Sequence, residues 1–443
     1  MTEVSGAEQS KQRFIFGSAI ALLIYATGIG LAFCSQLLIA RILGPASFGI
    51  YTYVFAWMSV LAYCANLGFK VSMLRFVSRY EAQKAWGLLR GIIRYAERRI
   101  GLACILIVLI GALGVLFRKE TLLPELSRTF LVGFLLVPVW AYLWLRCSVA
   151  RALGAVAFAL MPERIVRDGV LLASIMLAVF VFDMMLDASN VMSAMVASSL
   201  LGLLMATVGA RRLMPQEIAS ARIEFDADAW RQTALPLLLV GALEVLFSRT
   251  GVIVLGWFDA IKDVGIFGLA FNLALLALIP RTAIDTLMAP AISRLHAQDQ
   301  PEQMQKLMIQ AAAGSLLAAG CISLFLWIAA EYILSWFGPE YVAGRGVLMV
   351  LLVGQLVFAS FGSQLNVLAM TGHERTCALI LVFSTAVNIA LTTLLVGQFG
   401  LIGAAWAMAI SQFVFCCTLA VNVWRRLNLL PGMYGMLRYL RTA

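Results

Sequence analysis

Long apolar segments separated by short polar ones run along almost the whole chain. A helix needs about 20 apolar residues to cross the roughly 30 Å hydrocarbon core of a membrane. Segments of about this length lie near residues 14–40, 48–69, 100–117, 129–150, 164–183, 190–210, 233–257, 264–290, 307–329, 345–368, 376–396 and 401–424. Most are apolar on every face, which is typical of helices in lipid. The pattern predicts an all-α integral membrane protein with about 12 transmembrane helices.

The two halves of the chain resemble each other. Aligning "ASFGIYTYVFA" (46–56) with "KDVGIFGLAFN" (262–272) places Gly49 on Gly265 and Tyr51 on Phe267. Transporters are often built from two repeats related by an axis along the membrane normal. We therefore expect two six-helix lobes related by pseudo-two-fold symmetry.

A polar segment between the sixth and seventh apolar segments divides the chain. Residues 211–232 mix both signs of charge densely. We expect an N-terminal lobe at 1–210, a cytoplasmic connector at 211–232, a C-terminal lobe at 233–424 and a cytoplasmic tail at 425–443.

A tight hairpin is predicted between the first two helices. Gly44 and Pro45 end the first helix, because proline cannot continue it and glycine tolerates the turn. Ser47 can cap the next helix. Gly49 lacks a side chain where two helices are expected to approach closely.

The charges indicate orientation rather than a nucleic-acid partner. The chain is 62% hydrophobic and 13% charged, with a net charge of +10. With a cytoplasmic N-terminus, 24 of the 33 Lys and Arg residues lie on the cytoplasmic side, 6 lie outside and 3 lie within apolar segments. This bias predicts that both termini are cytoplasmic. No nucleic acid is expected to bind.

The longest polar segment, Val71 to Arg99, has an amphipathic pattern. Leu89 and Ile93 share one helical face, whereas Arg90 and Arg94 lie on the other. This pattern predicts a linker helix lying on anionic lipid at the inner membrane surface. A role in admitting substrate is the alternative.

The first hairpin also carries a family pattern, A-R-x-L-G-P-x-x-F/Y-G-x-Y. It is matched by Ala40, Arg41, Leu43, Gly44, Pro45, Phe48, Gly49 and Tyr51. The stretches "VGIFGLAFNLALL" (264–276) and "FGLIGAAWAMAIS" (399–411) are similar to the same family. The chain resembles the polysaccharide-biosynthesis flippases, the O-antigen and exopolysaccharide branch of the multidrug/oligosaccharidyl-lipid/polysaccharide superfamily.

This resemblance implies a carrier that moves undecaprenyl-pyrophosphate-linked oligosaccharide repeat units from the cytoplasmic to the outer leaflet of the bacterial inner membrane. Such a carrier serves surface polysaccharide biosynthesis, of lipopolysaccharide or exopolysaccharide. Its expected partners are the lipid-linked oligosaccharide, membrane lipids, a polysaccharide polymerase and a chain-length regulator. We expect a monomer.

Charged residues inside the apolar segments are the candidate substrate ligands, because a charge in the membrane requires a partner, water or a substrate. Arginine suits a pyrophosphate, to which it makes bidentate charge-assisted hydrogen bonds. We therefore expect Arg249, Arg281, Lys70 and Arg75 to bind substrate, the first two in a cavity between the lobes. The alternatives are an internal ion pair of Arg281 with Asp285, and snorkelling of Lys70 and Arg75 to inner-leaflet phosphates.

Two carboxylates are candidates for coupling transport to an ion gradient. Glu244 lies near the middle of the seventh apolar segment, where burial would disfavour its charged form. Asp285 follows Arg281 by one helical turn, so this arginine can hold it ionised. Glu244 is the preferred candidate, and a hydrogen bond to a neighbouring helix is its alternative role.

No enzymatic motif is present in the sequence: there is no H-E-x-x-H, Walker glycine loop or G-x-S-x-G. We therefore expect a transporter that is not an enzyme, with no catalytic residue, cofactor or metal site. A cation-coupled multidrug exporter of the same superfamily is the closest alternative function. A membrane-bound sugar polymerase or ligase is a more distant one.

Overall fold

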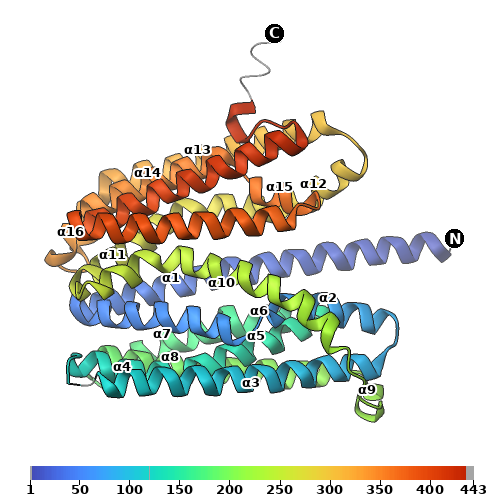
Figure 1. Cartoon of the computed structure of the whole chain (residues 1–443), viewed down its shortest axis with the longest axis horizontal. Coiled ribbons are helices and arrows are strands. Elements are labelled where there is room, and N and C mark those ends of the chain that lie inside the picture. The colour runs from blue at the N-terminus through green and yellow to red at the C-terminus, as the bar shows by residue number, and fades with distance from the viewer. Residues whose placement is uncertain (1, 119, 436–443) are drawn as a thin grey trace, which may run out of the picture. The chain divides into compact units, whose positions relative to one another are not determined.

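A computed structural model describes residues 2–118 and 120–435, and within this part every regular element is a helix (Figure 1). The α-helices of the first half are α1 (Thr2–Ala65), α2 (Phe69–Ala82), α3 (Trp86–Phe117), α4 (Pro124–Gly133), α5 (Leu136–Ala152), α6 (Val156–Met161), α7 (Arg167–Phe180), α8 (Ala188–Leu213) and α9 (Gln216–Ser220). Those of the second half are α10 (Ala227–Trp257), α11 (Ile261–Ala274), α12 (Ile279–Ala297), α13 (Pro301–Ser335), α14 (Arg345–Phe361), α15 (Gln364–Met370) and α16 (Glu374–Leu427). A π-helix, η1 (Pro162–Val166), and three 3-10 helices, η2 (Leu275–Leu278), η3 (Pro339–Gly344) and η4 (Gly432–Gly435), complete the set.

The described helices account for twelve membrane passes. Nine helical segments are long and apolar enough to cross a membrane. Two of them, Leu23–Ala82 and Glu374–Leu427, each contain two passes, because the chain reverses within them (Figure 1). The run α6–η1–α7 supplies the remaining pass, since its helix is interrupted by the π-turn. The prediction of an all-α membrane protein with about twelve spans is confirmed.

The two reversals occur at glycines. Gly44 has φ +69° and Gly400 has φ +55°, and each interrupts an otherwise helical run. Residues with a Cβ adopt this left-handed region only at a cost, so glycine is the residue suited to such a turn. Pro45 then starts the following helix in α1.

The chain forms two compact units. Unit 1 comprises Met1–Leu43 and Val54–Ala242, and unit 2 comprises Gly44–Tyr53 and Leu243–Ala443. The divisions fall within the second pass and within α10, and the other passes of each half of the chain lie in one unit, so the predicted two-lobed organisation is confirmed. The segment 211–232, predicted as a connector, lies within unit 1, where it forms the end of α8, α9 and the start of α10.

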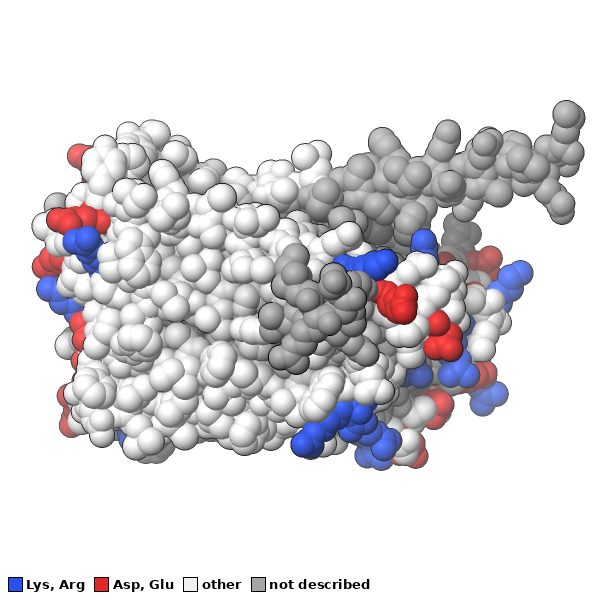
Figure 2. Space-filling view, turned by 90° about the horizontal axis from the view of Figure 1, so that it is seen from above, with Lys and Arg blue, Asp and Glu red and all other residues white. Residues whose placement is uncertain are grey.

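Apolar side chains cover the surface of the passes. On α3, residues such as Leu102, Leu109, Leu113 and Leu116 recur at helical spacing and are all more than half exposed. On α13, Ile328 is 77% exposed. Figure 2 shows charged residues gathered at the two ends of one face, with an uncharged belt between them. This distribution matches a surface solvated by lipid.

The amphipathic segment Val71 to Arg99 is not a separate helix on the membrane surface, and that prediction was wrong. Its first part belongs to α2, a turn at Lys84 follows, and its second part is the start of α3. Leu89 and Ile93 are buried. A Cβ added at Gly91 would overlap the carbonyl oxygen of Glu224, so this face packs against the segment between α9 and α10. The amphipathic pattern therefore reflects packing within unit 1.

In both units the second pass is broken. In unit 1, α1 ends at Ala65 and α2 begins at Phe69, with Leu67 and Gly68 at positive φ. A Cβ at Gly68 would overlap the carbonyl oxygen of Ala234, so the break lies directly on α10. In unit 2, η2 separates α11 from α12. Lys70 follows the break in unit 1 and Arg281 follows the break in unit 2, and both are predicted substrate ligands.

Candidate functional sites

Lys70 is the second residue of α2, directly after the break in unit 1. The buried Asn66 holds this break: its Oδ1 accepts from the Lys70 backbone N at 2.6 Å, and its Nδ2 donates to Ala141 O at 3.0 Å. Ser148 Oγ donates to Lys70 O at 2.7 Å. The start of α2 is thus tied to α5 through hydrogen bonds, which orient the Lys70 side chain.

The Lys70 ammonium lies among aromatic rings and one carboxylate. Its Nζ is 4.4 Å from the ring centroid of Trp144 and 5.7 Å from that of Tyr63. Glu163 Oε1 is 4.0 Å away. The Lys70 side chain is 32% exposed and that of Glu163 is 13% exposed. Cation–π contacts and an ion pair therefore stabilise a partly accessible positive charge.

Glu163 and its neighbours lie at the π-helix η1. Pro162 starts this element, and the wider π-turn changes the faces on which the following side chains lie. Arg164 stacks over the ring of Tyr25 at 4.7 Å. A Cβ at Gly28 would lie 2.6 Å from Arg164 Cβ, so the first pass approaches this turn closely.

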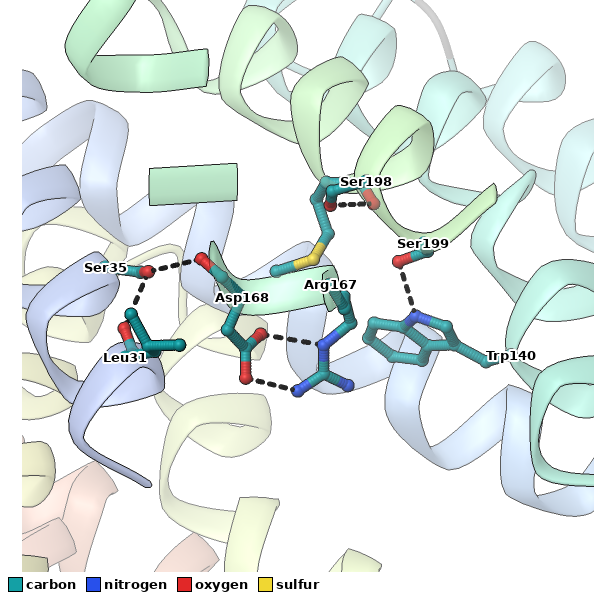
Figure 3. Close-up of polar contacts among 8 residues, drawn as sticks. Leu31, Ser35, Trp140, Arg167, Asp168, Ser198 and Ser199 are labelled. Atoms are coloured by element: carbon teal, nitrogen blue, oxygen red, sulfur yellow. Dashed lines mark hydrogen bonds and ion pairs between the residues drawn. The ribbon is translucent and has the colours of Figure 1, made fainter. Parts of the chain in front are cut away.

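Arg167 and Asp168 form a second polar group in unit 1 (Figure 3). Arg167 Nε donates to Asp168 Oδ1 at 2.8 Å, and a terminal guanidinium nitrogen donates to Oδ2 at 3.0 Å. Asp168 is 3% exposed, and its backbone carbonyl accepts from Ser35 Oγ at 3.2 Å. The Arg167 guanidinium lies 5.9 Å from the ring of Trp140, whose Nε1 donates to Ser199 Oγ at 3.0 Å. Helices α1, α5, α7 and α8 all contribute to this group.

In unit 2, Arg281 lies in the first turn of α12 and is 6% exposed. It donates to Phe358 O, and to Gly362 O at 3.0 Å, which satisfies carbonyls at the C-terminal end of α14. Its guanidinium carbon lies 3.5 Å from the Phe358 ring centroid. Arg281 Nε is 3.6 Å from Asp285 Oδ2, and Ser363 Oγ donates to Asp285 Oδ1.

Lys70 and Arg281 occupy matching positions in their units. Each follows a break in the second pass, and each lies over an aromatic ring of the fourth pass, Trp144 on α5 or Phe358 on α14. The spacing of the sequence repeat aligns Lys70 near Asp285, one turn beyond Arg281. Aligning the two units by their helix breaks therefore pairs Lys70 with Arg281, a match that the sequence repeat alone does not give.

The other predicted site residues differ in their surroundings. Arg249 lies half-buried on α10, and Arg75 is exposed on α2. The ion pair between Arg281 and Asp285 is present. Glu244 is exposed on α10, and its role in coupling stays a prediction. Its position in the middle of an apolar segment did not reveal whether it faces the packed side of the helix.

Sequence reasoning missed most of the unit 1 site. It did not select Glu163, Arg167, Asp168, Trp140 or Trp144. The available signal was "PERIVRD" (162–168), a proline followed by four charges at the start of an apolar segment. The tryptophans gave no signal, because aromatic residues in an apolar helix resemble those that face lipid.

Family models and relatives agree with this architecture. A model described as "Polysaccharide biosynthesis protein" matches residues 16–296, and a model named MatE matches residues 236–394. The probable flippase AglR of Haloferax volcanii is 30% identical over 175 residues. That match covers 38% of this chain and 36% of AglR, so it spans about a third of the relative's length.

Solved structures share the fold at low sequence identity. The inward closed lipid II flippase MurJ has a TM-score of 0.72 at 12% identity, with 91% of this chain and 87% of that chain covered. An inward-facing multidrug resistance MATE transporter has a TM-score of 0.70 at 13% identity, with 91% and 94% covered. The family model covers more than half of the chain. The chain therefore belongs to the polysaccharide biosynthesis protein family.

Proposed function

We propose that this protein is a flippase for undecaprenyl-pyrophosphate-linked oligosaccharide repeat units, which it moves from the cytoplasmic to the outer leaflet by alternating access. The observation that carries the proposal is the pair of matching cations, Lys70 over Trp144 and Arg281 over Phe358. In this proposal both bind oxygens of the anionic headgroup during the transport cycle. AglR is named a probable flippase and MurJ a lipid II flippase, and both names support the proposal that this chain is a flippase.

The surroundings of the two cations suit different steps. Lys70 is partly exposed, so a phosphate can approach it without rearrangement. Arg281 is only 6% exposed, and its contacts involve the last turn of α14. Substrate therefore reaches Arg281 only in a conformation in which this turn has moved away from α12. Arg249 and Arg75 are further candidate ligands.

The carboxylates of the two sites favour an anionic substrate over a cationic one. Glu163, Asp168 and Asp285 each lie beside a basic side chain, at the distances given above. Their charge is therefore largely compensated and is less available to an organic cation. We propose a transporter that carries out no covalent chemistry.

A cation-coupled multidrug exporter is the second candidate function. The MatE match over residues 236–394 and the likeness to MATE structures support it. This alternative predicts that expression confers resistance to cationic dyes, and that Lys70→Ala does not reduce this resistance. The flippase proposal predicts no such resistance.

We propose the bacterial inner membrane as the location, with both termini cytoplasmic, because basic residues concentrate in the loops on that side. We further propose that the protein acts as a monomer, together with a polysaccharide polymerase and a chain-length regulator.

Coupling to a proton gradient would require a carboxyl group that changes protonation during the cycle. Asp285 is the better supported candidate, because it contacts Arg281 and Ser363 and would sense movement of α14. Glu244 remains a candidate on α10. In proteoliposomes under an imposed pH gradient, loss of the gradient response in Asp285→Asn but not in Glu244→Gln would assign the role to Asp285. The reverse result would assign it to Glu244.

The experiment that tests the function uses a strain lacking this protein, in which surface polysaccharide is measured at matched levels of each variant. Lys70→Ala and Arg281→Ala should reduce the polysaccharide strongly. Arg294→Ala, an exposed arginine of α12, is the matched control and should not. Normal polysaccharide from both site variants would contradict the proposal.

A further inference from the structure

A half-open apolar pocket of about 260 Å³ lies at the junction of α2, α3 and the first part of α10, and all its lining residues belong to unit 1. Its apolar lining includes Phe69, Leu235 and Leu238. Two arginines, Arg99 on α3 and Arg231 on α10, also line it. Lys70 and the polar groups around Asp168 are not part of this lining, so the pocket is distinct from the proposed substrate site.

The two arginines are available to a ligand. Both side chains are exposed, and the Arg99 guanidinium stacks on the ring of Tyr95 at 5.3 Å. Arg231 forms an ion pair with Asp228 on the same helix, but both side chains are more than 60% exposed. Such an exposed pair contributes little stability, so exchanging it for another anion costs little.

The walls of the pocket are held by packing inside unit 1. Gly68 lies directly on α10, and Trp230 Nε1 donates to the Tyr80 hydroxyl at 3.0 Å. The rings of Tyr95 and Trp230 lie 5.4 Å apart at their centroids. These contacts fix α10 against α2 and α3, and the pocket is therefore preformed.

We propose that this pocket binds an anionic phospholipid of the surrounding membrane. The phosphate would lie between Arg99 and Arg231, which suit the bidentate recognition of phosphate oxygens. One acyl chain would occupy the apolar wall formed by Phe69, Leu235 and Leu238. A preformed pocket lined by both arginines and apolar side chains matches an amphiphile rather than a free phosphate.

Bound lipid would stabilise the part of α10 that leads into the other unit. Leu235 and Leu238 flank Pro236, whose missing N–H weakens the helix there. The division between the units falls a few residues further on, between Ala242 and Leu243. A lipid joining Arg99 to Arg231 clamps the unit 1 end of this helix, so anionic lipid should raise the thermal stability of the protein.

The test uses the full chain in nanodiscs of phosphatidylcholine, to which phosphatidylglycerol is added. Binding is measured by native mass spectrometry and stability by thermal unfolding. Arg99→Gln and Arg231→Gln should each weaken phosphatidylglycerol binding roughly fivefold, the effect of losing one basic residue near an anionic lipid. Arg98→Gln is the matched control, because Arg98 is an exposed neighbour on α3 that does not line the pocket. A cooperative thermal unfolding transition in phosphatidylcholine alone shows that each variant is folded at the start of the measurement.

Two results would overturn this proposal. Equal loss of binding in Arg98→Gln and Arg99→Gln would indicate a diffuse charge effect without a site. Undecaprenyl phosphate binding through Arg99 and Arg231, with no binding of phosphatidylglycerol, would make the pocket a substrate site. Glycerol phosphate, which has no acyl chain, should neither bind measurably nor stabilise the protein.

Discussion

Gly49 of α1 and Gly265 of α11 face each other where these two helices meet, and both residues belong to unit 2. A Cβ added at Gly49 would overlap Ile261 O and lie 3.1 Å from Gly265 N. A Cβ added at Gly265 would overlap Pro45 O and lie 3.1 Å from Gly49 N. These are also the glycines that the sequence repeat aligns with each other. Equivalent positions of the two repeats therefore form one backbone-to-backbone contact, with no room for a side chain.

Substituting either glycine by alanine should separate these helices. We expect Gly49→Ala and Gly265→Ala each to lower the free energy of unfolding by about 1–3 kcal/mol, the usual cost of inserting atoms into a packed interior. Thermal unfolding of the purified protein measures this. Gly320→Ala in α13 is the control, since a Cβ there meets nothing within 4 Å. Unchanged stability of both variants would show that the helices are not in contact.

Lys70 and Glu163 should depend on each other. Lys70→Ala leaves the mostly buried Glu163 carboxylate without its cation, so we expect a loss of about 1–3 kcal/mol of stability. The double variant Lys70→Gln/Glu163→Gln removes both charges and should recover most of that loss. A double-mutant cycle by thermal unfolding gives the coupling energy. Additive effects of the single changes would mean that the two side chains do not interact.

Arg281 should contribute to the stability of unit 2 apart from any role in transport. Arg281→Ala removes the donor for Phe358 O and Gly362 O at the end of α14, and we expect about 1–3 kcal/mol of destabilisation. Arg281→Lys should be intermediate, because an ammonium lacks the planar fork of donors. Arg294→Ala serves as the control in the same unfolding measurement. A fully stable Arg281→Ala protein would contradict the contacts described for α14.

The orientation in the membrane can be tested by cysteine labelling of a cysteine-free protein in intact cells. Met185 is 98% exposed in the turn before α8, and Lys84 is exposed in the turn between α2 and α3. We expect an impermeant reagent to label Met185→Cys and not Lys84→Cys. Labelling of Lys84→Cys alone would invert the topology.

Hydropathy could predict the helices because lipid imposes a length and a composition on every pass. The turn at Gly44 and Pro45 was also predictable, since few residues allow it. The packing of Val71 to Arg99 was not, because an amphipathic face has the same pattern whether it covers a membrane or another helix. The partner surface, around Glu224, lies more than 120 residues away in the sequence.

The site was only partly predictable for a similar reason. Arg281 and Lys70 stood out as charges in apolar segments, but their aromatic partners Trp144 and Phe358 did not differ from lipid-facing residues. The π-turn at Pro162 changes which side chains share a face, and a regular helical period could not show that Glu163 lies near Lys70. Whether Glu244 is exposed depends on how α10 is rotated about its own axis, and hydropathy does not specify that rotation.

The most direct test measures flipping of a lipid-linked oligosaccharide by proteoliposomes that contain the purified protein. The informative variant is Lys70→Gln/Glu163→Gln, which removes the cation without leaving a buried carboxylate unpaired. A charge-assisted hydrogen bond contributes roughly 1.5–3 kcal/mol, so the account predicts a flipping rate at least about tenfold below that of the parent. Lys70→Arg, which keeps the charge, should retain most of the rate. A folded Lys70→Gln/Glu163→Gln protein that flips the substrate at the parent's rate would contradict the account.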